Sequence, residues 1–179
     1  MIPETIVDRP LTDGERHMST LVFKNEVDTK LVRIRYPADP LNEERRAYTD
    51  GNIIKYPYNI QNGAETQYSD DLSKSSHLDK RRTLIHELAH VWQYQPYGRK
   101  IGHSNEHNEY SYRDRLNDRK WIRFDLWGRE QQAEAYGDLY LLIIGRESNA
   151  HFMIDGVLRR LGPEDIDLLL AAIHSADPR

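Results

Sequence analysis

Apolar residues near the start of the chain recur at helical spacing behind a helix-capping pattern. Thr12 precedes these residues and Glu15 lies three positions after it, which is the spacing of a capping box. We therefore expect a helix that begins after Thr12 and buries Met18, Leu21, Val22 and Phe23. Residues 31–36 alternate between apolar and polar side chains and predict a strand. Residues 47–58 predict a hairpin, because the Asp-Gly pair at 50–51 favours a tight turn.

A polar segment, residues 61–76, separates this region from a second helical pattern. Ser76 and Asp79 have the spacing of a helix cap, and the helix is expected to end at about Tyr94, before Pro96. Its apolar residues have the i, i+3, i+4, i+7 spacing of a buried helix face, and they are Ile85, Leu88, Ala89 and Trp92. The pattern thus predicts one long helix with a single apolar stripe.

The last third of the chain is predicted to be helical. After a polar stretch at residues 100–118, a long helix is expected over 128–146, and two shorter helices over 151–160 and 163–175. Together with the early strands, this predicts an α+β fold in which a small N-terminal antiparallel sheet packs on helices. At 179 residues the chain fits a single domain, in which the helices after about 150 cover the core or form a docking element.

Composition removes several classes of function. The chain has no cysteine, which excludes disulfides, thiol nucleophiles and cysteine-bound zinc. Its net charge is -4 and its pI is about 6.1, so no basic surface for nucleic acid is expected. The longest aliphatic run, residues 139–144, is too short to cross a membrane, and the first ten residues lack the apolar core of a signal peptide. We expect synthesis in the cytoplasm, with export open only to a system that needs no signal peptide.

A candidate metal site lies in the middle of the second predicted helix. His86 and His90 are four residues apart, so both imidazoles project from one helix face and can bind one metal ion. Two imidazoles with a carboxylate favour zinc, although other divalent ions stay open as occupants of such a site. Bound zinc makes a water more acidic. Glu87 lies about 100° round the helix from His86, where it can take the proton of that water as it attacks a carbonyl. His86 and His90 are therefore candidate ligands, and Glu87 is the candidate general base.

Two other sequence patterns of zinc peptidases could supply a third ligand, and neither fits this chain well. The metzincin class of zinc peptidases requires glycine at 93 and histidine at 96, where this chain has Gln93 and Pro96. His103 and His107 enclose a reversed H-x-x-E-H pattern, but that pattern needs a helix and here lies in a polar loop.

A more favourable third ligand lies on the helix predicted over 128–146. Glu130 and Glu134 are one turn apart on one face, and Asp138 follows a turn later. Stacked carboxylates repel each other, which indicates a positive partner, either a metal ion or a charged side chain. An acid in a first helical turn also interacts favourably with the helix dipole, which accounts for Glu130 more easily than for the other two.

These residues together resemble the gluzincins, zinc peptidases in which a glutamate from a second helix completes an HExxH site. The resemblance implies one zinc ion per chain and a minimal zincin-like domain with an active-site helix and a second, glutamate-bearing helix. It also implies that Glu130 binds zinc and that Glu134 orients a ligand histidine. Because Glu134 stands where many such enzymes have aspartate, an exchange of the two roles stays open.

A closer resemblance covers the chain from Arg9 to about Leu142. The chain is similar there to the small bacterial Vgr-related proteins, a family of metallopeptidases linked to type VI secretion and Rhs-type systems. The matching segments are 9–12, 14–15, 32–34, 84–93 and 130–134. This resemblance implies a metal site and a bacterial setting more firmly than it implies a substrate. The expected substrate is a peptide or protein, the expected role is that of a bacterial effector or accessory protein, and components of type VI secretion are the expected partners.

The transition-state stabiliser and the substrate are less well defined by the sequence. Zinc peptidases place a tyrosine, histidine or arginine near the developing oxyanion, and Tyr110, Tyr112, His103 and His107 lie between the ligand segments. Two other functions stay open. One is a non-catalytic adaptor that keeps the metal site, against which the intact Glu87 argues. The other is an amidase that acts on cell-wall peptide by the same zinc chemistry.

Overall fold

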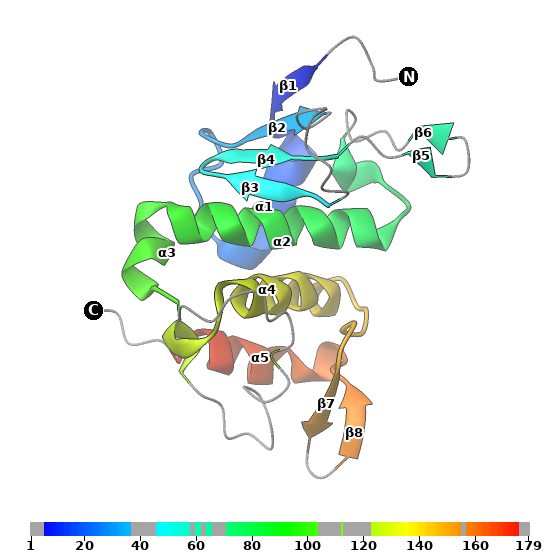
Figure 1. The fold of residues 1–179 in the computed structure, drawn as a ribbon. Coiled ribbons are helices and arrows are strands. Elements are labelled where there is room, and N and C mark those ends of the chain that lie inside the picture. Colours follow the sequence, from blue (N-terminus) through cyan, green and yellow to red (C-terminus); the bar gives the residue numbers. More distant parts are fainter. Residues whose placement is uncertain are drawn as a thin grey trace. The chain divides into compact units, whose positions relative to one another are not determined.

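The computed structural model describes residues 6–36, 46–57, 60–61, 64–65, 71–103, 112, 123–154 and 157–175. The chain divides into two compact units, Met1–Gln95 and Pro96–Arg179. Each unit contains helices and strands (Figure 1), which confirms the predicted α+β fold class. The organisation as a single domain stays a prediction.

A four-stranded sheet forms one layer of the first unit. Its order is β1-β2-β4-β3, with β1 Val7–Pro10, β2 Arg33–Tyr36, β3 Tyr48–Asp50 and β4 Ile53–Lys55. The predicted hairpin is present as β3 and β4, and Gly51 in its turn has a φ of +60°, which glycine adopts without strain. Two of the three strand pairings are antiparallel, as expected, and the pairing of β2 with β4 is parallel. A further pair of short strands consists of β5 (Ile60–Gln61) and β6 (Ala64–Glu65).

The helix α1 (Asp13–Phe23) begins as the sequence predicts. Thr12 is its N-cap, and the capping box with Glu15 is complete. The buried positions follow the i, i+3, i+4, i+7, i+8 stripe and are Glu15, Met18, Ser19, Val22 and Phe23. The prediction that Leu21 is buried is wrong, since its side chain is 40% exposed. Leu21 lies outside this buried stripe. The polar residues Glu15 and Ser19 occupy positions in it instead.

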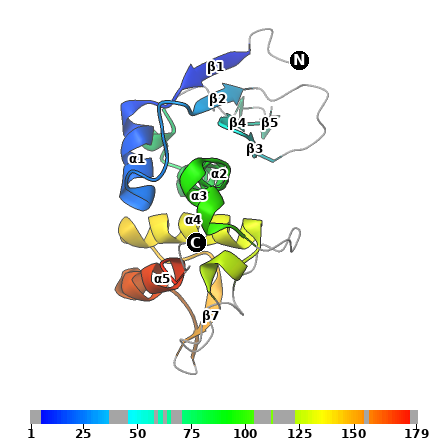
Figure 2. The same cartoon turned by 90° about the vertical axis from the view of Figure 1, so that its left-hand side faces the viewer.

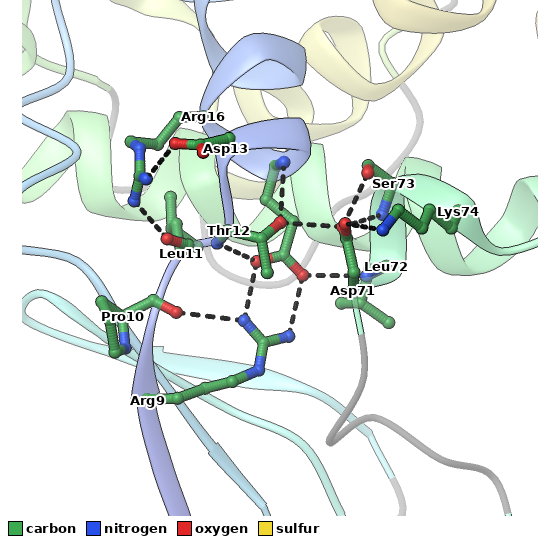
Figure 3. Close-up of polar contacts among 11 residues, drawn as sticks. Arg9, Pro10, Leu11, Thr12, Asp13, Arg16, Asp71, Leu72, Ser73 and Lys74 are labelled. Atoms are coloured by element: carbon green, nitrogen blue, oxygen red, sulfur yellow. Dashed lines mark hydrogen bonds and ion pairs between the residues drawn. The ribbon is translucent and has the colours of Figure 1, made fainter.

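A network of polar side chains fastens α1 to β1 and to the 3-10 helix η1 (Leu72–Lys74), as Figure 3 shows. Glu15 is fully buried and accepts two hydrogen bonds of 2.8 Å from the guanidinium of Arg9. It also accepts from the backbone nitrogens of Thr12 and Leu72, each at 2.9 Å. Thr12 Oγ1 lies 2.8 Å from Asp71 Oδ1. These contacts give residues 9–15 a structural role in the first unit.

Electrostatics stabilise the charged members of this network. Burial by itself lowers the pKa of Arg9, but the hydrogen bond and charge of Glu15 outweigh it and raise that pKa overall. Burial by itself raises the pKa of Asp71, but hydrogen bonds from Ser73 and Thr12 lower it overall. Both groups therefore stay ionised near neutral pH. Arg9 keeps the charge that it needs for its salt bridge to Glu15, and Asp71 remains an acceptor for the hydroxyl of Thr12.

The long helix α2 (Leu78–Tyr94) packs against β3 and β4 and carries the histidine motif. Figure 2 shows α1 and α2 on the same side of the sheet. All four residues of the predicted apolar stripe are buried. The predicted cap of Ser76 and Asp79 is wrong, because the helix begins at Leu78 and His77 is the N-cap without a side-chain hydrogen bond. Asp79 instead lies in the first turn, where it interacts favourably with the helix dipole.

The second unit contains the predicted helix α4 (Arg129–Ile143) and a helix that was not expected, α3 (Pro96–Ile101). Pro96 ends α2, as predicted, but it then starts α3, because proline fits the first turn of a helix. The short 3-10 helix η4 (Phe124–Leu126) precedes α4. The helix predicted over 163–175 is present as the 3-10 helix η5 (Pro163–Asp165) followed by α5 (Ile166–Ile173).

The helix predicted over 151–160 is wrong. This segment forms an antiparallel hairpin of β7 (His151–Ile154) and β8 (Val157–Arg160). Burial along β7 alternates, with Phe152 and Ile154 inside and their neighbours exposed. This period of two is the pattern of a strand with one buried face, and it is too short to be distinguished from helical spacing in the sequence.

An aromatic cluster forms part of the core of the second unit. The ring of Tyr112 stacks on Trp127 at a centroid distance of 5.4 Å and contacts Phe152 at 4.9 Å. Phe124 contacts Trp127 at 5.0 Å and meets Tyr136 edge-on. None of the helices in the described part of the chain is long and apolar enough to cross a membrane.

Candidate metal centre

The helix α2 brings the two motif histidines together on one face. His86 and His90 are 9% and 5% exposed, and their Nε2 atoms are 3.2 Å apart. The rings meet nearly at right angles, with an interplanar angle of 82° and centroids 4.9 Å apart. Two nitrogen donors therefore converge on a single point beside the helix.

The separation of these nitrogens fits a shared zinc ion. Zinc–imidazole bonds of about 2.0–2.1 Å at a tetrahedral angle place the two nitrogens roughly 3.3–3.4 Å apart. The observed Nε2–Nε2 distance of 3.2 Å is close to this value. The donor set also fits, because neutral imidazole is a common zinc ligand.

Gln93 fixes the orientation and tautomer of one of these histidines. Nδ1 of His90 lies 2.9 Å from Oε1 of Gln93, which is an acceptor only, so Nδ1 carries the proton. The Nε2 atom of a neutral His90 then presents its lone pair outward. Gln93 is 7% exposed, which shields this hydrogen bond from water. Gln93 thus holds His90 by a hydrogen bond of the kind that the gluzincin resemblance implies for Glu134, whose own role stays a prediction.

Replacing Gln93 by leucine should weaken zinc binding about 10–100-fold, because loss of the group behind a ligand histidine typically has that effect. A competition titration with a chromogenic chelator measures the change. The variant Gln93→Glu keeps an acceptor in the same place and should retain the affinity. If Gln93→Leu binds zinc as tightly as the wild type, the hydrogen bond to His90 has no role in metal binding.

The candidate base Glu87 is held by a residue that sequence reasoning did not identify. Glu87 is 4% exposed, and its Oε2 accepts a hydrogen bond of 2.8 Å from Oγ1 of Thr49. Thr49 lies in the middle of β3, beside the hairpin turn. Gln93 could have been found from its i+3 spacing to His90. Thr49 could not, since it meets Glu87 only through the packing of β3 on α2.

An ion pair closes the hairpin that carries Thr49. Lys55 Nζ lies 2.8 Å from Asp50 Oδ2 across the antiparallel strands. The hydrogen bond from Lys55 lowers the pKa of Asp50, and the same contact raises the pKa of Lys55. Asp50 is largely exposed, so this pair contributes little to stability and chiefly adds local order to the turn.

The acidic residues that the sequence proposes lie on α4 in the second unit. Glu130 is in the first turn and Glu134 in the next, and both are half-buried. Asp138 is fully buried and accepts hydrogen bonds from Tyr112 Oη at 2.8 Å and from the backbone of Asn149 at 3.3 Å. The histidine pair belongs to α2 and could bind a metal ion, the identity of which the donors alone leave open. The assignment of Glu130 on α4 as the third ligand stays a prediction.

The candidates for a transition-state stabiliser lie partly outside the described residues. Tyr110 and His107 are outside them, and His103 is exposed just after α3. Tyr112 is only 1% exposed, and its hydroxyl donates to Asp138 while its ring packs in the aromatic cluster. These contacts favour a packing role for Tyr112. The assignment of Tyr110 or Tyr112 as stabiliser stays a prediction.

The fold of the chain is similar to that of an effector domain among the solved structures. That structure is the effector domain of Pseudomonas aeruginosa VgrG2b, which superposes with a TM-score of 0.53 and 25% sequence identity. The similarity covers 78% of this chain and 77% of the other. No family model matches the sequence, and neither does any curated protein.

Proposed function

We propose that this chain is a zinc-dependent peptidase that serves as a bacterial effector or accessory protein of type VI secretion. The observation that carries the proposal is the pair of buried imidazoles with convergent Nε2 atoms, beside a buried carboxylate on the same helix. The similarity to an effector domain supports the bacterial effector role. An adaptor with a purely structural metal would have no use for Glu87.

In this proposal, His86, His90 and Glu130 hold the zinc ion, and Glu134 is the supporting or alternative acid. A zinc ion held by these residues would supply a Lewis acid for the substrate carbonyl and would make a water nucleophilic at neutral pH. Glu87 takes the proton of the attacking water and then passes it to the departing amine nitrogen.

Metal content distinguishes the two acids of α4. Glu130→Ala should lower zinc affinity about 100-fold or more, because it removes a ligand, whereas Glu134→Ala should lower it less. Zinc per chain after dialysis against a weak chelator measures both variants under the same conditions. The opposite order would exchange the two roles, and equal retention in both would exclude these acids as ligands.

The proposal as a whole is tested by cleavage of a peptide library. The zinc-loaded chain should cleave a subset of peptides, and a chelator should stop the cleavage, with products identified by mass spectrometry. Peptides of the bacterial cell wall are included as a separate arm, since the same chemistry can hydrolyse their amide bonds. Absence of cleavage in both arms by a chain that carries one zinc ion would overturn the proposal.

A further inference from the structure

We infer that Thr49 is a positioning residue for the carboxylate of Glu87, an inference that rests on the proposed function. Its Oγ1 lies 2.8 Å from Oε2 of Glu87 and 3.1 Å from the backbone oxygen of the same residue. The two residues belong to different elements, β3 and α2, and are 38 positions apart in sequence. The contact therefore fixes the carboxylate from outside its own helix.

The hydroxyl hydrogen of Thr49 goes to the carboxylate rather than to the backbone. A hydroxyl has only one hydrogen to donate. Oε2 is the closer of the two acceptors and belongs to a side chain that is charged when it acts as a base. A hydrogen bond to an ionised acceptor is shorter and stronger than one to a neutral carbonyl. The backbone oxygen of Glu87 already has a partner in the α-helical ladder.

The hydrogen bond from Thr49 gives the two carboxylate oxygens of Glu87 different roles. Oε2 is occupied by the threonine, whereas no side chain among residues 6–36, 46–57 and 71–95 donates to Oε1. With its rotation restricted by Thr49, the carboxylate presents Oε1 in one orientation. That oxygen is then the one that receives the proton from water and returns it to the amine.

The hairpin holds its place on α2 without help from this hydrogen bond. Thr49 pairs with Ile54, which is fully buried under the helices. Near the turn, Gln95 Nε2 donates to Asn52 Oδ1 at 2.9 Å, and Gln95 also bonds to Asp28. These contacts hold β3 and β4 against the end of α2. The hydroxyl of Thr49 is therefore not needed to keep the hairpin packed on the helix. Its removal should change the orientation of Glu87 rather than the position of the strand.

The test compares Thr49→Val, which keeps the branched shape but lacks the hydroxyl, with Thr49→Ser, which keeps the hydroxyl. On the fastest-cleaved peptide of the library, Thr49→Val should lower kcat about tenfold and leave KM within about twofold. Thr49→Ser should restore most of the rate. Thr20→Val is the matched control, because it also removes a threonine hydroxyl in the first unit but one that bonds to the backbone of Arg16. It should leave kcat unchanged.

Two readouts do not depend on turnover. The zinc affinity of Thr49→Val should equal that of the wild type, and crystal structures of the metal-free proteins should show the Glu87 carboxylate displaced in Thr49→Val alone. An unchanged carboxylate, or a wild-type kcat in Thr49→Val, overturns the role of Thr49 and leaves the proposed function intact. A wild type that cleaves no peptide overturns the proposed function, and the role of Thr49 in hydrolysis falls with it.

Discussion

Replacing Glu87 by glutamine is expected to abolish peptide hydrolysis while leaving one zinc ion per chain in place. Glutamine has the size of glutamate, and its amide oxygen can still accept the hydrogen bond from Thr49. It has no basic site for the proton of the attacking water. Since general acid–base catalysis contributes about 10²–10⁴-fold, kcat should fall by about three orders of magnitude.

Steady-state rates and zinc content are measured on the same preparations of wild type and Glu87→Gln. Glu26→Gln provides the matched control, because this acid accepts a hydrogen bond from Trp92 Nε1 at 2.9 Å, away from the histidine pair. The control should retain wild-type activity. A rate for Glu87→Gln within tenfold of the wild type would show that another group acts as the base. Loss of zinc from Glu87→Gln would show that Glu87 is itself a ligand.

The second large effect concerns stability. Glu15→Ala should lower the free energy of unfolding by about 3–5 kcal/mol, the usual result of removing one partner of a buried ion pair. The substitution leaves the guanidinium of Arg9, which is 16% exposed, without its bidentate acceptor. It also removes the acceptor for the backbone nitrogens of Thr12 and Leu72. Urea denaturation followed by circular dichroism measures the change.

Asp13→Ala is the control for this prediction on the same helix. Asp13 is almost fully exposed and pairs with Arg16 at the surface, so its loss should change the free energy of unfolding by less than about 1 kcal/mol. Comparable values for Glu15→Ala and Asp13→Ala would mean that the network around Glu15 does not stabilise the first unit.

The parts of the structure that follow local rules were predictable from the sequence. The capping box at Thr12, the hairpin turn at Gly51 and the length of α2 depend on residues within one element or its ends. The facing of His86 and His90 follows in the same way from helical geometry. These features were therefore predicted with nearly the observed bounds.

The remaining features depend on contacts between elements. The hydrogen bond from Thr49 to Glu87 and the parallel pairing of β2 with β4 arise only when distant segments meet. The β7–β8 hairpin was predicted as a helix because four residues of alternating burial are a weak pattern. The stripe of α1 likewise includes buried Glu15 and Ser19, whose polar side chains an apolar pattern does not select.

The rate of peptide hydrolysis, measured as zinc is returned to the metal-free chain, shows directly whether zinc activates this chain. The substrate is the fastest-cleaved peptide of the library. We expect no hydrolysis before zinc is added and a rate that rises in proportion to zinc until about one equivalent per chain is bound. Full hydrolysis by the metal-free chain, or no hydrolysis after one equivalent is bound, would contradict it.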